Sequence, residues 1–153
     1  MAYSGKYKVK NPDKYVGDVT KVEFRSLWER GLMKWLDHNT DIISWNSEEV
    51  RIPYVCGTDN RVHTYIIDFW ILTKTGKSIL IEVKPDVQTK PPTIPERTPS
   101  GRKSRRYLNE SFKYIKNQSK WIAATKYAEQ NGMEFKVWTE HTLRSLGIKI
   151  ARK

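Results

Sequence analysis

The sequence predicts a single α/β domain in which helices flank a β-sheet. Two segments, 20–40 and 107–130, repeat apolar residues at the three-and-four spacing of a helix face. Between them, residues 65–84 form two runs rich in β-branched and aromatic side chains around a turn, which is typical of paired strands. A chain of 153 residues can bury one substantial core and is short for two, so we expect one domain over residues 1–153.

The first third of the chain predicts an arm, a helix and the start of a hairpin. Residues 1–18 are basic and lack an apolar period, so we expect an extended arm. Thr20-Lys21-Val22-Glu23 has the form of a capping box and predicts a helix that ends near residues 37–40. Residues 42–55 indicate an edge strand or extended connection, and a turn follows at 57–60. The inward face of the helix is expected to carry Phe24, Leu27, Trp28, Leu32, Trp35 and Leu36.

The middle of the chain predicts two strands, 65–73 and 77–84, around the turn Lys74-Thr75-Gly76. If Gly76 takes the left-handed position of a three-residue loop, Thr73 pairs with Lys77 and Asp68 lies opposite Glu82. Side chains alternate along a strand, so Asp68, Glu82 and Lys84 share one face. That face also carries Ile66, Trp70, Leu72 and Leu80, and the opposite face is apolar, with Ile67, Phe69, Ile71, Ile79, Ile81 and Val83.

The last part of the chain predicts a basic loop, a helix and a strand. Residues 85–106 are rich in proline and predict a flexible loop that clamps DNA, through Lys90, Arg97, Arg102, Lys103, Arg105 and Arg106. The helix 107–130 is expected to end at Asn131-Gly132 and to turn Leu108, Phe112, Ile115, Ser119 and Ile122 inward. A strand at 134–139, a helical turn at 141–146 and a basic tail at 149–153 should complete the chain.

The charge of the chain predicts a polyanionic partner. Lys and Arg number 28 against 17 Asp and Glu, a formal net charge of +11, which favours double-stranded DNA. With neither an apolar run of about 18 residues nor a leader segment, we expect a soluble intracellular protein. The single Cys56 excludes an internal disulfide, and the histidines, His38, His63 and His141, lack the close pairing of zinc sites. We therefore expect any metal to be held by oxygen.

The facing carboxylates of Asp68 and Glu82 suggest phosphodiester hydrolysis. The two like charges would repel across the strands, and a divalent cation between them would relieve that repulsion. Lys84 could orient or deprotonate the attacking water, or offset charge in the transition state. The plainer interpretation is a pair of strand-end carboxylates balanced by basic neighbours, with Lys84 as an ordinary edge lysine.

Asp68, followed on the next strand by Glu82-Val83-Lys84, resembles the D…(D/E)-x-K signature of the PD-(D/E)xK nucleases. The resemblance implies a restriction-endonuclease-like core, with a mixed sheet flanked by helices. It also implies Mg²⁺ or Mn²⁺ bound by Asp68, Glu82 and the backbone carbonyl of Val83, while Lys84 assists the water. Ile67 stands where the motif that gives the family its name has proline.

Two narrower resemblances add a fourth site residue and a biological setting. Ser26-Leu27-Trp28-Glu29 resembles the S-x-x-E run in the nuclease subunit of heteromeric transposases, which implies a role for Glu29 at the site. The residues alone equally allow Glu29 to pair with Arg25 on a solvated helix surface. The whole chain is similar to nucleases that act in head completion of T-even-like tailed phages. That similarity implies phage DNA as substrate, portal and head-completion proteins as partners, and a place in the host cytoplasm or on the virion head.

These observations favour a metal-dependent DNA endonuclease or exonuclease, with Lys113 and Lys120 as further DNA contacts. A non-catalytic DNA-binding or scaffolding protein of a virion assembly would have the same charge. A pure binder gains nothing, however, from two carboxylates placed where phosphates approach. A structure-specific resolvase would share the chemistry and prefer branched DNA.

Overall fold

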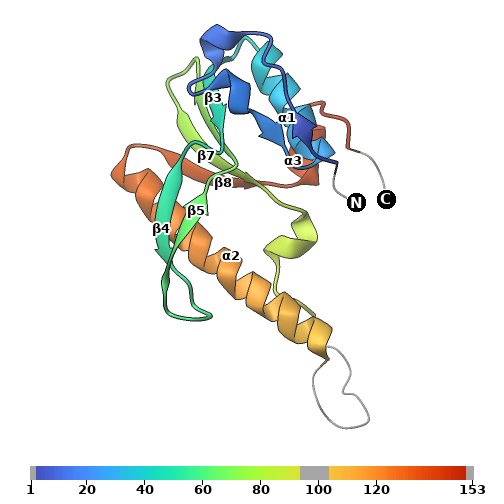
Figure 1. Cartoon of the computed structure of the whole chain (residues 1–153), viewed down its shortest axis with the longest axis vertical. Coiled ribbons are helices and arrows are strands. Elements are labelled where there is room, and N and C mark those ends of the chain that lie inside the picture. Colours follow the sequence, from blue (N-terminus) through green and yellow to red (C-terminus); the bar gives the residue numbers. More distant parts are fainter. Residues whose placement is uncertain (1–2, 94–103, 151–153) are drawn as a thin grey trace.

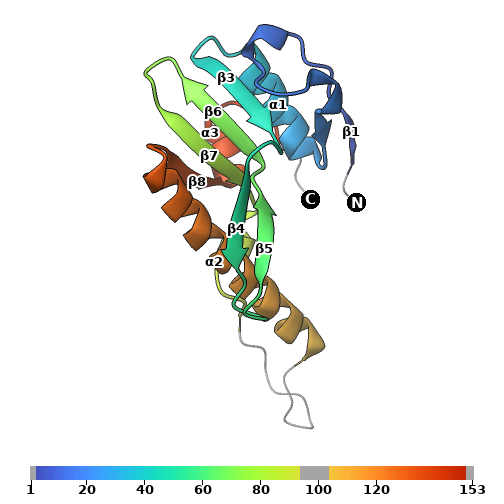
Figure 2. The ribbon, with the colours of Figure 1, turned by 60° about the vertical axis from the view of Figure 1, so that its left-hand side comes forward.

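The computed structural model describes residues 3–93 and 104–150, and its centre is a four-stranded mixed sheet (Figures 1 and 2). The strands lie in the order β3 (Ile42–Ser47), β6 (Phe69–Thr73), β7 (Ser78–Val83) and β8 (Glu134–Trp138). The β3–β6 and β6–β7 pairs are antiparallel, and the β7–β8 pair is parallel. A two-stranded hairpin, β4 (Arg51–Val55) with β5 (Val62–Ile66), extends from one end of this sheet. The expected α/β class with a mixed sheet is confirmed.

Helices cover both faces of the sheet, and each face has its own apolar cluster. Helices α1 (Leu27–His38) and α3 (Glu140–Ser145) pack on one face, with Phe69, Ile71, Ile79 and Ile81 beneath them. Helix α2 (Arg105–Gln130) packs on the other face and on the β4–β5 hairpin, around Leu80, Tyr54 and Tyr65. Among the described residues, no helix combines the length and apolarity needed to cross a bilayer.

The helix expected to begin at Thr20 begins instead at Leu27. A short 3₁₀ helix (Val19–Lys21), capped by Asp18, precedes strand β2 (Glu23–Phe24), which pairs with β1 (Gly5–Lys6). Ser26 is the true N-cap of α1, and its hydroxyl oxygen accepts a hydrogen bond from the amide of Glu29. Two segments that begin with Ser or Thr and end with Glu, residues 20–23 and 26–29, follow one another here. Glu23 pairs with β1, so the helix begins at the second segment.

The N-terminal segment is packed against the domain and is not the expected extended arm. Tyr7 and Tyr15 are buried edge-on against Trp45. The buried carboxylate of Asp37 accepts hydrogen bonds from the Tyr7 hydroxyl and from the amides of Lys10 and Asn11. After the 3₁₀ turn Pro12–Lys14, the Lys14 ammonium donates hydrogen bonds to the carbonyls of Leu36, Asp37 and Asn39 at the C-terminal end of α1. The buried tyrosines and the Asp37 carboxylate thus hold this segment in place. Neither interaction produces a periodic pattern in the sequence that would predict it.

The predicted register of the central hairpin is confirmed. Gly76 has φ +87°, the amide of Thr73 donates to the carbonyl of Lys77 at 2.9 Å, and Phe69 pairs with Ile81. A left-handed glycine closes the three-residue turn as expected.

The strand expected at residues 65–73 is broken in two at Ile67 and Asp68. Ser47 pairs with Phe69 and Arg51 pairs with Ile66, so the three residues 48–50 lie opposite the two residues 67–68. One extra residue on one side is the pattern of a β-bulge, which bends and twists a strand pair. The expected single segment 42–55 is broken at the same level, into β3 and β4, which belong to different sheets.

Helix α2 turns a different face inward from the expected one. It begins at Arg105 with Ser104 as N-cap, and Leu108, Phe112, Ile115 and Ile122 are 41–69% exposed. Ala124 and Ala128 are buried, and Trp121 and Tyr127 pack beside them. The first half of α2 extends past the central sheet (Figures 1 and 2), so its apolar side chains do not pack on that sheet. In the second half, the small side chains of Ala124 and Ala128 let the helix approach the sheet closely.

Candidate active site

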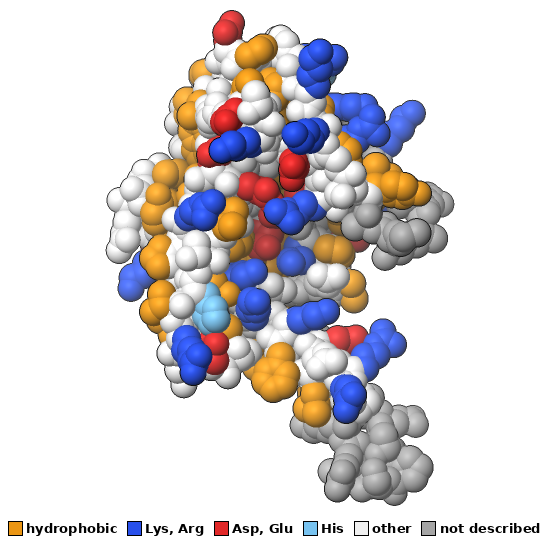
Figure 3. All heavy atoms as spheres, in the orientation of Figure 1, with side chains coloured by type: hydrophobic (Ala, Val, Ile, Leu, Met, Phe, Trp, Pro, Cys, Tyr) orange, Lys and Arg blue, Asp and Glu red, His pale blue; other side chains and the backbone are white. Residues whose placement is uncertain are grey.

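The bulge and the end of β7 bring the predicted triplet of site residues together. Asp68 lies at the bend, Glu82 lies on β7, and Lys84 follows β7 directly. One carboxylate oxygen of Asp68, Oδ2, accepts a hydrogen bond from the Val83 amide at 2.9 Å. The Lys84 Nζ lies 3.8 Å from Oε1 of Glu82. Figure 3 shows acidic side chains at the centre of one face of the molecule, with lysine and arginine side chains around them.

Glu82 is held by two donors that the sequence analysis did not identify. Its side chain is buried, and its Oε2 accepts a hydrogen bond from the Tyr65 hydroxyl at 2.7 Å and another from the indole N–H of Trp121. The Oε1 atom lies toward Lys84. Both donors are directed at one oxygen, so they fix the orientation of the carboxylate.

The break at Asp68 explains why Tyr65 was not expected at the site. In an unbroken strand, Tyr65 and Ile67 would share the apolar face with Phe69. In the structure, Tyr65 and Ile67 belong to the cluster beneath α2, and Phe69 belongs to the opposite cluster. Trp121 was missed because the sequence pattern assigned the wrong inward face to α2.

The pKa of Asp68 is raised to about 7. Burial is the main cause, and the nearby charge of Glu82 adds to it, whereas the hydrogen bond from the Val83 amide opposes it. The charge of Glu29 also raises this pKa, and Lys84 lowers it. Near neutral pH, the repulsion between the Asp68 and Glu82 carboxylates is therefore relieved by a proton or by added positive charge.

Glu29 is buried and lies close enough to Asp68 to affect its pKa. Its Oε2 accepts hydrogen bonds from the amide of Arg25 and the hydroxyl of Ser26, each at 3.3 Å, and burial raises its own pKa. The guanidinium of Arg25 pairs with Glu48 at 2.7 Å. The alternative of a solvated Arg25–Glu29 pair is therefore wrong, and Glu29 joins the acidic group from α1.

Lys120 on α2 lies near the same group of carboxylates. The Nζ of Lys120 lies 5.2 Å from the centre of the Tyr65 ring. Burial lowers its pKa, and the negative charge of Glu82 opposes that shift. Lys113 and Lys116 precede it at helical spacing on one side of α2, and both are exposed.

The other expected DNA contacts are dispersed. Lys90 follows the 3₁₀ helix η3 (Asp86–Thr89) and pairs with Asp86 at 3.1 Å. Arg105 is exposed in the first turn of α2, and Arg106 pairs with Glu110 at 2.9 Å. Arg97, Arg102 and Lys103 lie outside the described residues, as does the middle of the expected loop, residues 94–103.

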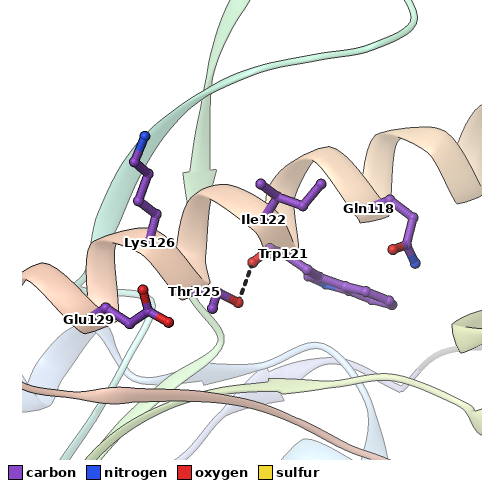
Figure 4. Close-up of a pocket in the computed structure, with 6 residues that line it drawn as sticks. All are labelled: Gln118, Trp121, Ile122, Thr125, Lys126 and Glu129. Atoms are coloured by element: carbon purple, nitrogen blue, oxygen red, sulfur yellow. Dashed lines mark hydrogen bonds between the residues drawn. The ribbon is translucent and has the colours of Figure 1, made fainter.

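A shallow hollow of about 430 Å³ lies along α2, lined by Gln118, Trp121, Ile122, Thr125, Lys126 and Glu129 (Figure 4). All of its lining comes from successive turns of one helix, and the Thr125 hydroxyl donates to the Trp121 carbonyl within it. Trp121 links the hollow to the site, since its indole also contacts Glu82. The hollow is open to solvent and is lined by one helix alone, so it gives no reason to place the reaction there.

The donors at the site suit a hard divalent cation. Asp68, Glu82 and Glu29 offer carboxylate oxygens, which Mg²⁺ and Mn²⁺ prefer, and no sulfur or imidazole lies among these three. The raised pKa of Asp68 is the sign expected where two carboxylates lack a counter-cation. The residues present therefore fit such an ion.

Comparisons with known proteins agree with this chemistry. Residues 39–140 match a family model described as "TnsA-like endonuclease N terminal". That range contains Asp68, Glu82 and Lys84, and Glu29 precedes it. The chain is also 42% identical over 149 residues to the head completion nuclease of Enterobacteria phage T4, which covers 97% of this chain and 99% of that protein.

The raised pKa of Asp68 predicts a pH-dependent loss of stability without metal. The folded state retains a proton on Asp68 that the unfolded chain releases near pH 4. The stability contributed by this group is therefore full below about pH 4 and is lost as pH rises through about 7. In chelator near pH 8, we expect Asp68→Asn to be more stable than the parent by roughly 1–3 kcal/mol.

Thermal unfolding from about pH 5 to pH 8 tests this expectation, at about 2–4 °C per kcal/mol for a chain of this size. The exposed Asp41, which pairs with Lys74 at the surface, provides the control variant Asp41→Asn. The gap between Asp68→Asn and the parent should widen with pH and narrow when Mg²⁺ is added. A gap that is constant with pH would contradict the assignment.

Proposed function

Because the chain belongs to the family of TnsA-like endonuclease N-terminal domains, we propose that this nuclease hydrolyses DNA phosphodiester bonds with a divalent cation at Asp68 and Glu82. The observation that carries the proposal is the convergence of these two carboxylates with Lys84 at the bend of the sheet. Mg²⁺ is the proposed ion, with Mn²⁺ able to replace it. A bound divalent cation would neutralise charge on the phosphate oxygens and assist activation of water.

The chain's own groups divide the remaining work. Asp68 and Glu82, with the Val83 carbonyl, would hold the cation, and Glu29 would add a carboxylate from α1. Lys84, with its Nζ 3.8 Å from Glu82, would orient the attacking water or offset phosphate charge. Tyr65 and Trp121 act as positioning residues, because they hold Oε2 of Glu82 and keep the carboxylate in one orientation.

We place the DNA backbone along the lysine side of α2. Lys113, Lys116 and Lys120 would contact successive phosphates and lead the strand to the carboxylates. Lys120 is the innermost of the three, above the Tyr65 ring. Lys90, Arg105 and Arg106 would extend this basic surface, and Arg97, Arg102 and Lys103 remain proposed contacts.

The T4 relative suggests a biological setting. Its name assigns it to head completion, and its similarity spans nearly the whole of both chains. We propose that this chain likewise acts on phage DNA at head completion and head–tail joining, inside the host cell. Portal or head-completion proteins would be its partners.

Cleavage of supercoiled plasmid tests the nuclease proposal. With Mg²⁺ we expect nicking by the parent, none in chelator, and a loss of at least about 100-fold in Asp68→Asn and Lys84→Met, since each removes a group that acts on the reacting centre. Lys74→Met, at the far end of the hairpin and paired with the exposed Asp41, is the control and should keep full activity. Plasmid binding without cleavage by the folded parent in Mg²⁺ and in Mn²⁺ would favour the DNA-binding or scaffolding alternative.

Removal of the Tyr65 hydroxyl tests the proposed positioning of Glu82. We expect Tyr65→Phe to raise the Mg²⁺ concentration needed for half-maximal cleavage by about 10-fold, because the carboxylate loses one of its two donors. Tyr54→Phe is a matched control, a buried tyrosine of the same hairpin whose ring packs on Tyr65. An unchanged Mg²⁺ dependence in Tyr65→Phe would assign the hydroxyl a purely structural role.

A further inference from the structure

The turn of the β4–β5 hairpin gathers three metal-binding side chains away from the carboxylate site. Cys56 follows β4, Asp59 lies in the turn, and His63 lies on β5. Their ligand atoms all lie within 4.8 Å of one another. We propose that this cluster binds a zinc ion or a similar transition metal in a structural site distinct from the proposed Mg²⁺ site.

The backbone of the turn builds this cluster. The Cys56 amide donates to the Arg61 carbonyl at 3.0 Å, and the Asn60 amide donates back to the Cys56 carbonyl at 2.8 Å. Asp59 uses Oδ1 to accept from the Arg61 amide at 2.9 Å, and its Oδ2 lies 2.8 Å from Nε2 of His63. Asp59 therefore has one oxygen for the turn and one that faces His63.

The donor types favour zinc over magnesium. Zn²⁺ binds thiolate, imidazole and carboxylate at about 2.3, 2.0–2.1 and 2.0–2.2 Å, usually with four ligands. Three protein ligands leave one position for water or for the hydroxyl of Thr58, whose Oγ1 lies 3.0 Å from the Cys56 sulfur. Binding would release the thiol proton of Cys56, and the Asp59–His63 contact would lengthen to admit the ion.

A metal ion bound here would stabilise the β4–β5 hairpin, which carries Tyr65. The Tyr54 ring packs between His63 and Tyr65, with centroid distances of 5.6 and 6.4 Å, and the Tyr65 hydroxyl reaches Glu82. The turn also rests on α2, where the Gly57 amide donates to the Ser119 hydroxyl at 3.0 Å. A side chain at residue 57 would come within 3.0 Å of Ile115, so glycine permits this close approach.

The histidine–aspartate pair alone does not account for the cluster. Both side chains are about 40% exposed, at 40% and 39%, and exposed ion pairs contribute little to stability. That pair also gives no role to the buried thiol beside it. The cluster contains neither paired histidines nor paired cysteines, and its signal in the sequence is the irregular spacing Cys-x₂-Asp-x₃-His.

Titration of the metal-free full chain with Co²⁺ tests the proposal. The chain has one cysteine, so a thiolate-to-cobalt charge-transfer band reports on Cys56 alone. We expect this band, with the visible absorption of a four-coordinate ion, to appear at one equivalent and to disappear when Zn²⁺ is added. It should persist in the Asp68→Asn, Glu82→Gln double variant, which separates it from the proposed nuclease site.

Two variants decide whether the site is built from the cluster. His63→Gln should weaken Co²⁺ binding at least about 10-fold, and His38→Gln, an exposed histidine on α1, should not. With the carboxylate site removed by Asp68→Asn and Glu82→Gln, Zn²⁺ should raise the melting temperature of the chain that retains Cys56 but not that of the chain that also carries Cys56→Ser. No thiolate band in the folded parent, or a band of equal affinity in His63→Gln, would overturn the proposal, the latter by showing adventitious binding to the thiol.

Discussion

The repulsion between Asp68 and Glu82 is the constraint around which this molecule is arranged. Burial removes the water that would screen the two carboxylates, and the pKa of Asp68 rises to about 7 as a result. The Val83 amide, the Tyr65 hydroxyl and the Trp121 indole each donate to one of them. These donors orient the pair without cancelling its charge, so the site retains a demand for positive charge that a bound cation can meet.

The bulge opposite residues 48–50 makes this arrangement possible. It places Asp68 at a bend and redirects β5, so that Tyr65 comes to lie beneath α2 on the same side as Glu82. The carbonyl of Asp68 accepts a hydrogen bond from the Glu48 amide, and the Ile67 amide donates to Val50. The backbone is therefore hydrogen-bonded at the bend itself. This one bulge sets the direction of the β4–β5 hairpin and the positions of Tyr65 and Asp68.

Local chemistry made part of this structure predictable. The turn at Gly76 fixes the pairing of its own strands, so the proximity of Asp68, Glu82 and Lys84 followed from a few neighbouring residues. The bend at Ile67 and the partner of α2 depend on distant segments, and no short pattern contains them. Leu108, Phe112 and Ile115 have helical spacing but belong to neither core cluster, whereas Trp121 and Ala124 pack in the cluster beneath α2. The Cys56 cluster was visible only as an irregular spacing.

The most direct test of the central claim is a count of Mn²⁺ ions bound by the folded protein, from the electron paramagnetic resonance signal of free Mn²⁺. The measurement is made in a Cys56→Ser background, so that the hairpin cluster does not contribute. Binding of at least one Mn²⁺ that is lost when Asp68→Asn is added is the result predicted by a cation site at the Asp68–Glu82 carboxylate pair. Equal Mn²⁺ binding with and without the Asp68 carboxylate would contradict it.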